Sequence, residues 1–148
     1  MIKILDDHYE LPIRKIDKNE ILFVPTHTVN WEFDSFAKLY GAKDNNRVFG
    51  KAGRTYAIPV AMHTTKWLPY FNIKYFLGKF EFYCRKHPDK NFLIPHFTTP
   101  MYTEEILGRL FRPFKDLDNV YLCKEFYPFA ITDEDLILTT DCGHEFAI

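Results

Sequence analysis

The feature that most constrains the fold of this chain is an alternation of short apolar runs with segments of helical periodicity. Apolar runs of strand length occupy residues 20–25, 55–60, 91–95 and 119–123. Strands that alternate with helices favour an α/β fold with a largely parallel sheet. In such sheets the ligand crevice lies beyond the carboxyl ends of the strands, so a functional site is expected at that edge.

Helices are predicted in the intervals between these runs. Asn30 can cap a first helix, and residues 42–53 have the composition of a loop. Residues 70–87 form the clearest helix, and Thr103 can cap a further helix that ends at Pro113. The apolar stripe of the 70–87 helix comprises Ile73, Phe76, Leu77, Phe80 and Cys84, and its outward face comprises Lys74, Lys79, Glu81, Arg85 and Lys86.

Length, charge and cysteine content narrow the class of protein. The 148 residues suit a single domain over 1–148, with a core at about 20–127 and a C-terminal extension or edge strand at 128–148. The net charge of −1 gives no general attraction for nucleic acid or an anionic membrane. No apolar run approaches the ~18 residues of a membrane span, and the N-terminus is too charged for a signal peptide. Three cysteines without CxxC spacing are typical of reduced thiols, so we expect a cytoplasmic protein, in the host cytoplasm if a phage encodes it.

Three of the predicted strands end in a similar pattern of residues. An aliphatic–proline pair is followed by one histidine (His27, His63 or His96) and by two threonines. Proline cannot donate to the ladder and is expected to turn the chain outward, while threonine hydroxyls, loop amides and a helix start can bind phosphate or sugar oxygens. Such residues are also common in ordinary turns. The candidate ligand-binding residues at this edge are Thr26, His27, Thr28, Asn30, Trp31, His63, Thr64, Thr65, His96, Phe97, Thr98, Thr99 and Tyr102.

Several segments, taken in order, resemble a compact macro-domain-like family of phages and bacteria. The segments are EILFV (20–24), GRTYAIP (53–59), LPYFNIKYFL (68–77), FYCRKHPDKNFLI (82–94), YTEEI (102–106), LF (110–111) and DNVYLCKEF (118–126). The resemblance covers about residues 20–127. It implies a three-layer α/β/α sandwich around a mostly parallel mixed sheet, and ADP-ribose or a related nucleotide as the ligand class.

The sequence departs from this family at both of its ligand loops. Members follow the first strand with a glycine- and asparagine-rich loop that contains His-Gly-x-Gly, whereas residues 25–34 of this chain contain no glycine. They carry a Gly-Cys-Gly-type loop after the strand that ends here at Ile94, whereas this chain has PHFTTPM at 95–101. Glycine lets a backbone approach a diphosphate closely. We therefore expect a retained scaffold whose site carries different chemistry.

Four functions are open at this edge of the sheet. The favoured one is a non-catalytic, cofactor-free binder of a nucleotide-type small molecule or of a host or partner protein, such as a phage accessory or counter-defence factor. The second is a hydrolase of an ADP-ribosyl or phosphate ester, with His27 or His96 as acid/base and Asp34 as the nearest carboxylate. The third is a metal site formed by His27, His63 and His96. The fourth is a structural or interaction protein without a pocket, including a homodimer.

Overall fold

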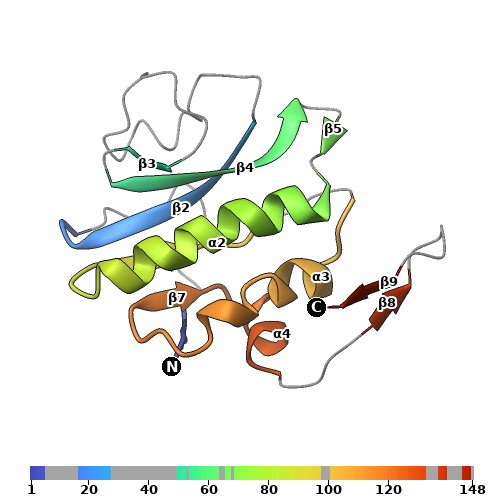
Figure 1. The fold of residues 1–148 in the computed structure, drawn as a ribbon. Coiled ribbons are helices and arrows are strands. Elements are labelled where there is room, and N and C mark those ends of the chain that lie inside the picture. The colour runs from blue at the N-terminus through green and yellow to red at the C-terminus, as the bar shows by residue number, and fades with distance from the viewer. Residues whose placement is uncertain are drawn as a thin grey trace.

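The computed structural model describes residues 1–5, 17–27, 50–52, 54–63, 66–67, 69–97, 101–132, 137–139 and 145–147 of the chain. Figure 1 shows the arrangement of its helices and strands. The strands are β1 (Lys3–Ile4), β2 (Glu20–His27), β3 (Gly50–Ala52), β4 (Thr55–His63), β5 (Lys66–Trp67), β6 (Asn91–Ile94), β7 (Val120–Leu122), β8 (Ile137–Thr139) and β9 (Glu145–Ala147). The helices are α2 (Tyr70–Lys86), α3 (Glu104–Arg109), the 3₁₀ helix η1 (Arg112–Phe114) and α4 (Tyr127–Ile131).

The main sheet is mixed and mostly parallel. Its strand order is β1–β7–β6–β2–β4–β3, and β5 pairs with β4 beside this path. The pairs β1/β7, β7/β6, β6/β2 and β2/β4 are parallel, whereas β3 and β5 pair with β4 antiparallel. Helix α2 follows β5 and precedes β6 in the chain, and it runs along one face of the sheet (Figure 1). The predicted α/β class and mostly parallel mixed sheet are therefore confirmed. Strands β8 and β9 form a separate two-stranded antiparallel sheet.

Two prolines lie inside strands rather than at their ends, which corrects the prediction that they turn the chain outward. Strand β2 continues past Pro25, and β4 continues past Pro59. A proline is tolerated in a strand where its missing N–H has no ladder partner. The pairing of β2 with β6 ends at Leu22, before Pro25. Pro59 lies between the part of β4 that pairs with β3, which ends at Ala57, and the part that pairs with β5.

Helices α2 and α3 match two predicted helices, with one shift, whereas η1 and α4 were not predicted. Helix α2 begins after Pro69, and Thr103 caps α3 because its Oγ1 accepts a hydrogen bond from the Ile106 N–H at 3.3 Å. Helix α3 ends at Arg109, so Pro113 does not end it but lies early in η1, where a missing N–H is harmless. Within the described ranges, no helix is long and apolar enough to cross a membrane.

The remaining differences concern segments that depend on a pairing partner. Residues 50–52, expected in a loop, form β3 by antiparallel pairing with β4. Strand β1 was not predicted, and it pairs with β7 at the edge of the sheet. The helix predicted after Asn30 lies outside the described residues.

Both faces of the central strands are buried. One face packs against α2 and the other described helices in a single core cluster, whose sheet residues include Phe23, Ile58 and Ile94. Leu22, Ala57 and Leu93 alternate with these residues along their strands and are also buried, at 0–1% exposure. A sheet buried on both faces is what the central layer of an α/β sandwich requires.

Candidate functional site

The three histidine-bearing strand ends lie at one edge of the sheet. Strand β2 ends at His27, β4 ends at His63, and His96 follows the end of β6 by two residues. Because β4, β2 and β6 are neighbours and parallel, their carboxyl ends meet at the same edge, as predicted. The ends are staggered, since His27 pairs with Ala61 and His63 lies two residues further on. Two residues of strand span roughly 7 Å, so the backbones of His27 and His63 are not level.

The predicted site residues fall into three groups: those described by their backbone, those described with their side chains, and those outside the described part of the chain. Thr26, His27 and His63 are placed by their backbone as strand residues, and His96, Phe97 and Tyr102 are described with their side chains. The predicted residues that lie outside the described part of the chain are Thr28, Asn30, Trp31, Asp34, Thr64, Thr65, Thr98 and Thr99.

His96 forms a hydrogen-bonded pair with a carboxylate that the sequence did not reveal as its partner. Its Nε2 donates to Oε1 of Glu104 at 2.9 Å, and the two side chains are 32% and 52% exposed. Glu104 is the first residue of α3, directly after the capping Thr103. The imidazole also packs against Phe126, with ring centroids 5.3 Å apart. The pair is thus held at the carboxyl end of β6 and remains accessible to solvent.

The pair has the parts of a polar recognition site. The carboxylate fixes the ring orientation of His96 and assigns the Nε2 proton. No described residue bonds Nδ1, which can accept a hydrogen bond when the ring is neutral and donate one when it is protonated. Glu104 lies in the first turn of α3, where a carboxylate is favourable beside the positive end of the helix dipole. An acidic residue at a helix start soon after a strand-end histidine was the available signal.

The two described aromatic candidates beside this pair belong partly to the core. Phe97 packs between Phe23 and Phe126, with centroid separations of 5.6 and 5.3 Å. Tyr102 is half-buried and contacts the ring of Tyr70 at 6.3 Å. Burial raises the pKa of the Tyr102 hydroxyl, because the charged form is poorly solvated there. Only the part of each ring that the core leaves uncovered can contact a ligand.

Metal ligands do not converge in the described part of the chain. Among those residues, no group of three or more histidine, cysteine, aspartate or glutamate side chains is placed to hold a metal ion. The side chains of His27 and His63 lie outside the described part of the structure, so the three-histidine metal site stays a prediction.

The described cysteines are structural rather than nucleophilic. Burial is the main cause that raises the pKa of the Cys123 thiol to about 12, and burial also raises the pKa of Cys84. The thiolate is the reactive form, so both thiols are expected to resist iodoacetamide in the folded protein at pH 8 and to react in denaturant. Peptide mass spectrometry after labelling measures this. Equal labelling of Cys123 with and without denaturant would show that its thiol is open to solvent.

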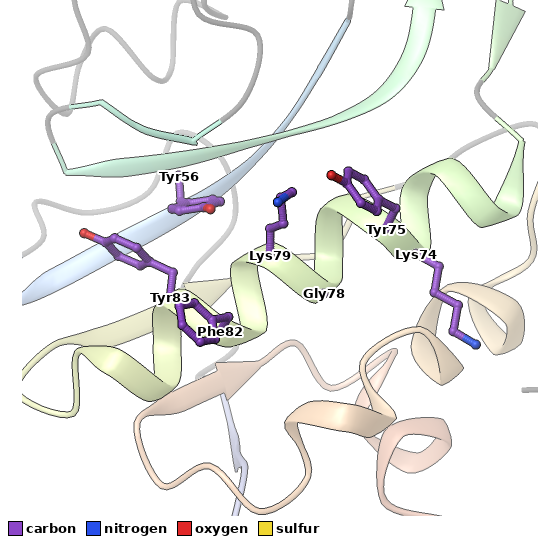
Figure 2. Close-up of a pocket in the computed structure, with 7 residues that line it drawn as sticks. All are labelled: Tyr56, Lys74, Tyr75, Gly78, Lys79, Phe82 and Tyr83. Atoms are coloured by element: carbon purple, nitrogen blue, oxygen red, sulfur yellow. The ribbon is translucent and has the colours of Figure 1, made fainter.

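A groove of about 650 Å³ lies between α2 and Tyr56 of β4, and its lining includes none of the three strand-end histidines. It is lined by Tyr56, Lys74, Tyr75, Gly78, Lys79, Phe82 and Tyr83 (Figure 2). Phe71, Tyr75 and Phe82 are each at least 60% exposed, and their spacing places them on one face of the helix. Ammonium groups lie over two rings, with Lys79 above Tyr75 and Lys86 above Phe82 at 5.1 and 5.2 Å. Exposed aromatic surface of this kind on a helix is a feature of protein–protein contact sites.

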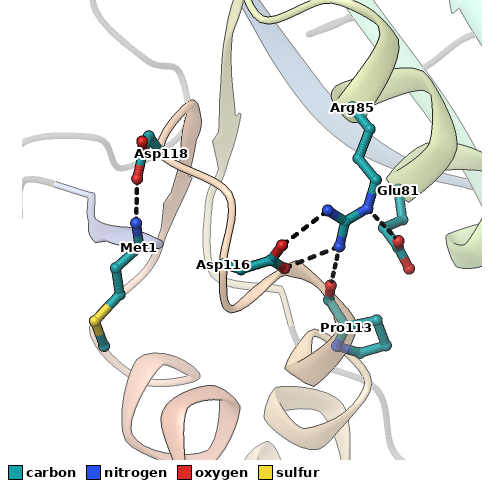
Figure 3. Close-up of polar contacts among 6 residues, drawn as sticks. All are labelled: Met1, Glu81, Arg85, Pro113, Asp116 and Asp118. Atoms are coloured by element: carbon teal, nitrogen blue, oxygen red, sulfur yellow. Dashed lines mark hydrogen bonds and ion pairs between the residues drawn. The ribbon is translucent and has the colours of Figure 1, made fainter.

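An ion-pair network ties the end of α2 to the segment after η1. The guanidinium of Arg85 donates to both carboxylate oxygens of Asp116 at 2.9 Å, to Glu81 at 2.6 Å and to the Pro113 carbonyl (Figure 3). The hydrogen bonds from Arg85 lower the pKa of Asp116 to about 2. The N-terminal ammonium of Met1 pairs with Asp118 close by. These contacts are exposed, and we assign them to anchoring rather than to chemistry.

Comparison of the chain with protein-family models, with curated proteins and with solved structures finds no match.

Proposed function

We propose that this chain is a non-catalytic binding protein with a macro-like scaffold, and that its ligand is a nucleotide-type small molecule related to ADP-ribose. The observation that carries the proposal is the His96–Glu104 hydrogen bond at the carboxyl end of β6. This pair lies at the sheet edge where β2 and β4 also end in histidine. In open α/β sheets this edge is the general position of ligand crevices.

Three properties of the edge favour such a ligand. His96 offers a ring nitrogen that can donate to a phosphate or accept from a sugar hydroxyl. Tyr102 and Phe97 supply aromatic surface against which a base or ribose can pack. Glu104 holds the imidazole in one orientation before the ligand arrives, which lowers the entropic cost of binding.

A hydrolase of ADP-ribosyl or phosphate esters is the second candidate, because the same pair also suits catalysis. A histidine oriented by a carboxylate is the usual arrangement of a general base. In this candidate, Glu104 is the carboxylate that orients His96. The described cysteines do not add a nucleophile, because both are buried. The fate of a bound ligand separates the two candidates.

Calorimetric titration of metal-stripped protein with ADP-ribose tests the proposal. We expect saturable binding in the micromolar range, weakened about tenfold or more by His96→Ala because a hydrogen bond to a charged ligand is lost. His87→Ala is the matched control, since His87 stacks on Tyr83 at the other end of α2 and is remote from the edge. It is expected to leave the affinity unchanged.

The ligand recovered from the complex then decides between binding and turnover. Intact ADP-ribose supports a binding protein, whereas hydrolysed ligand supports the enzyme, and Glu104→Gln is then expected to slow hydrolysis while the protein stays folded. If titration of wild-type protein with ADP-ribose releases or absorbs no heat of binding, the assignment of ADP-ribose as ligand is contradicted. Equal loss of affinity in His96→Ala and His87→Ala would exclude the edge as the binding site.

A further inference from the structure

A cavity of about 350 Å³ lies between α2 and the segment that runs from α3 through η1. It is lined by Tyr70, Lys74, Arg109, Leu110, Arg112, Pro113 and Lys115. Four of these seven residues are basic and none is acidic. Its volume suits a small ligand or one part of a larger one.

The cations converge because two separate elements meet at this point. Tyr70 and Lys74 are four residues apart on α2 and therefore share one face of that helix. Figure 2 shows Lys74 pointing away from Tyr56 and Tyr83, on the side of the helix where α3 lies. Arg109 ends α3, Arg112 begins η1 and Lys115 follows it, so the segment 109–115 presents three cations.

Arg109 is the most enclosed of these cations. Its side chain is 4% exposed, and its NH2 nitrogen donates to Oε1 of Glu105 at 3.2 Å, one turn earlier on α3. Arg109, Arg112 and Lys115 also interact with other residues of the chain, so the fold restricts their positions. Guanidinium groups held in place can bind two oxygens of one phosphate, which is more specific than a lysine point charge.

One nearby carboxylate, Glu105, pairs with Arg109 of the cavity, whereas others have partners outside the cavity lining. Asp116, adjacent to Lys115 in sequence, is bonded to Arg85 together with Glu81 (Figure 3). Asp118 pairs with the N-terminal ammonium, and Glu104 pairs with His96. Tyr70 adds a hydroxyl group to the lining, and burial raises its pKa to about 12. The cavity wall therefore combines positive charge with donors, which is the chemistry that binds oxyanions.

We propose that this cavity is a second binding site, specific for the phosphate group of a small phosphate monoester or diphosphate. It lies against the end of α3 that is opposite Glu104, and its lining includes neither His96 nor Glu104. Occupation of this site does not require a ligand at the histidine edge. The site therefore extends the proposed function to a phosphate-bearing molecule bound on the helical face of the sheet.

Calorimetric titration with inorganic phosphate and with pyrophosphate, at constant ionic strength, tests this site. Wild-type protein is expected to bind pyrophosphate saturably. Lys74→Ala and Arg112→Ala are each expected to weaken it about tenfold or more, because each removes a charge-assisted hydrogen bond. Lys79→Ala is the matched control, since Lys79 lies on the same helix but does not line the cavity. It is expected to bind as wild type does.

Two further variants separate the possible results. Arg112→Lys keeps the charge but loses the forked geometry, so partial recovery relative to Arg112→Ala supports phosphate recognition. His96→Ala is expected to leave pyrophosphate binding intact even if it abolishes ADP-ribose binding, which distinguishes the two sites. Thermal denaturation of each variant confirms that it is folded. No saturable binding of pyrophosphate to wild-type protein, or an equal loss in Lys79→Ala, would overturn the proposal.

Discussion

Replacement of Phe80 with alanine is expected to lower the free energy of unfolding by about 3–5 kcal/mol. Phe80 is fully buried at the centre of α2. Its ring contacts four others, those of Phe23, Tyr56, Phe92 and Phe114, at centroid separations of 5.6, 4.7, 5.7 and 5.6 Å. The substitution removes apolar contacts with three strands of the sheet and with η1, and it leaves a cavity that a rigid core cannot fill by relaxation. Urea denaturation followed by far-UV circular dichroism measures the change.

Phe82→Ala is the matched control for this prediction. Phe82 lies two residues further along the same helix, but its side chain is 62% exposed and its main described contact is the Lys86 ammonium. Its removal is expected to change the free energy of unfolding by no more than about 0.5 kcal/mol. A cost for Phe82→Ala as large as that for Phe80→Ala would mean that α2 presents a different face to the sheet.

The α2 result also explains why much of the fold could be predicted from the sequence. Ile73, Phe76, Leu77, Phe80 and Cys84 were assigned to the buried stripe from their spacing. Four of them are buried, and Phe76 is partly buried against the core. Helical periodicity is a local property, because residues three or four positions apart always share a face. The apolar runs of β2, β4, β6 and β7 are likewise local, since a strand buried on both faces has few polar residues.

The short strands of the main sheet that were not predicted depend on contacts with residues distant in sequence. Strands β1, β3 and β5 contain two or three residues each and include lysines, so no apolar run marks them. Each exists because a longer strand offers its unpaired backbone groups at that position. The extension of β2 and β4 beyond their prolines has the same cause, because it depends on which neighbouring strands have already ended.

The candidate sites divide in the same way. The position of His96 at the carboxyl edge followed from a strand-end pattern, whereas its pairing with Glu104 depends on how the start of α3 packs beside β6. The basic cavity was not predicted, because Lys74 was assigned to the outward face of its helix. The periodicity of one helix gives no information about its neighbours, and the cations from Arg109 to Lys115 belong to α3, η1 and the residue that follows η1.

Replacement of Gly108 with alanine is expected to destabilise the protein by about 1–3 kcal/mol, although alanine is the better helix former. Gly108 is buried in α3 where this helix meets α4. A Cβ atom at this position would lie 2.8 Å from the backbone oxygen of Phe126 and 2.8 Å from the Cβ of Phe129. Neither atom is the end of a flexible side chain, so relief of the overlap requires α3 and α4 to move apart. Phe126 is fully buried, and that movement would disturb its packing with Phe111 and Phe97.

Gly78→Ala tests the same substitution in α2, where the surroundings are open. No atom lies within 4 Å of a Cβ built at Gly78, and the residue occurs in the middle of a regular helix. Alanine is expected to stabilise the protein there by about 0.5–1 kcal/mol, because glycine loses more backbone entropy on folding. The two substitutions are therefore expected to have opposite signs in the same urea titration. A stabilising Gly108→Ala would show that α3 and α4 do not pack backbone against backbone at this position.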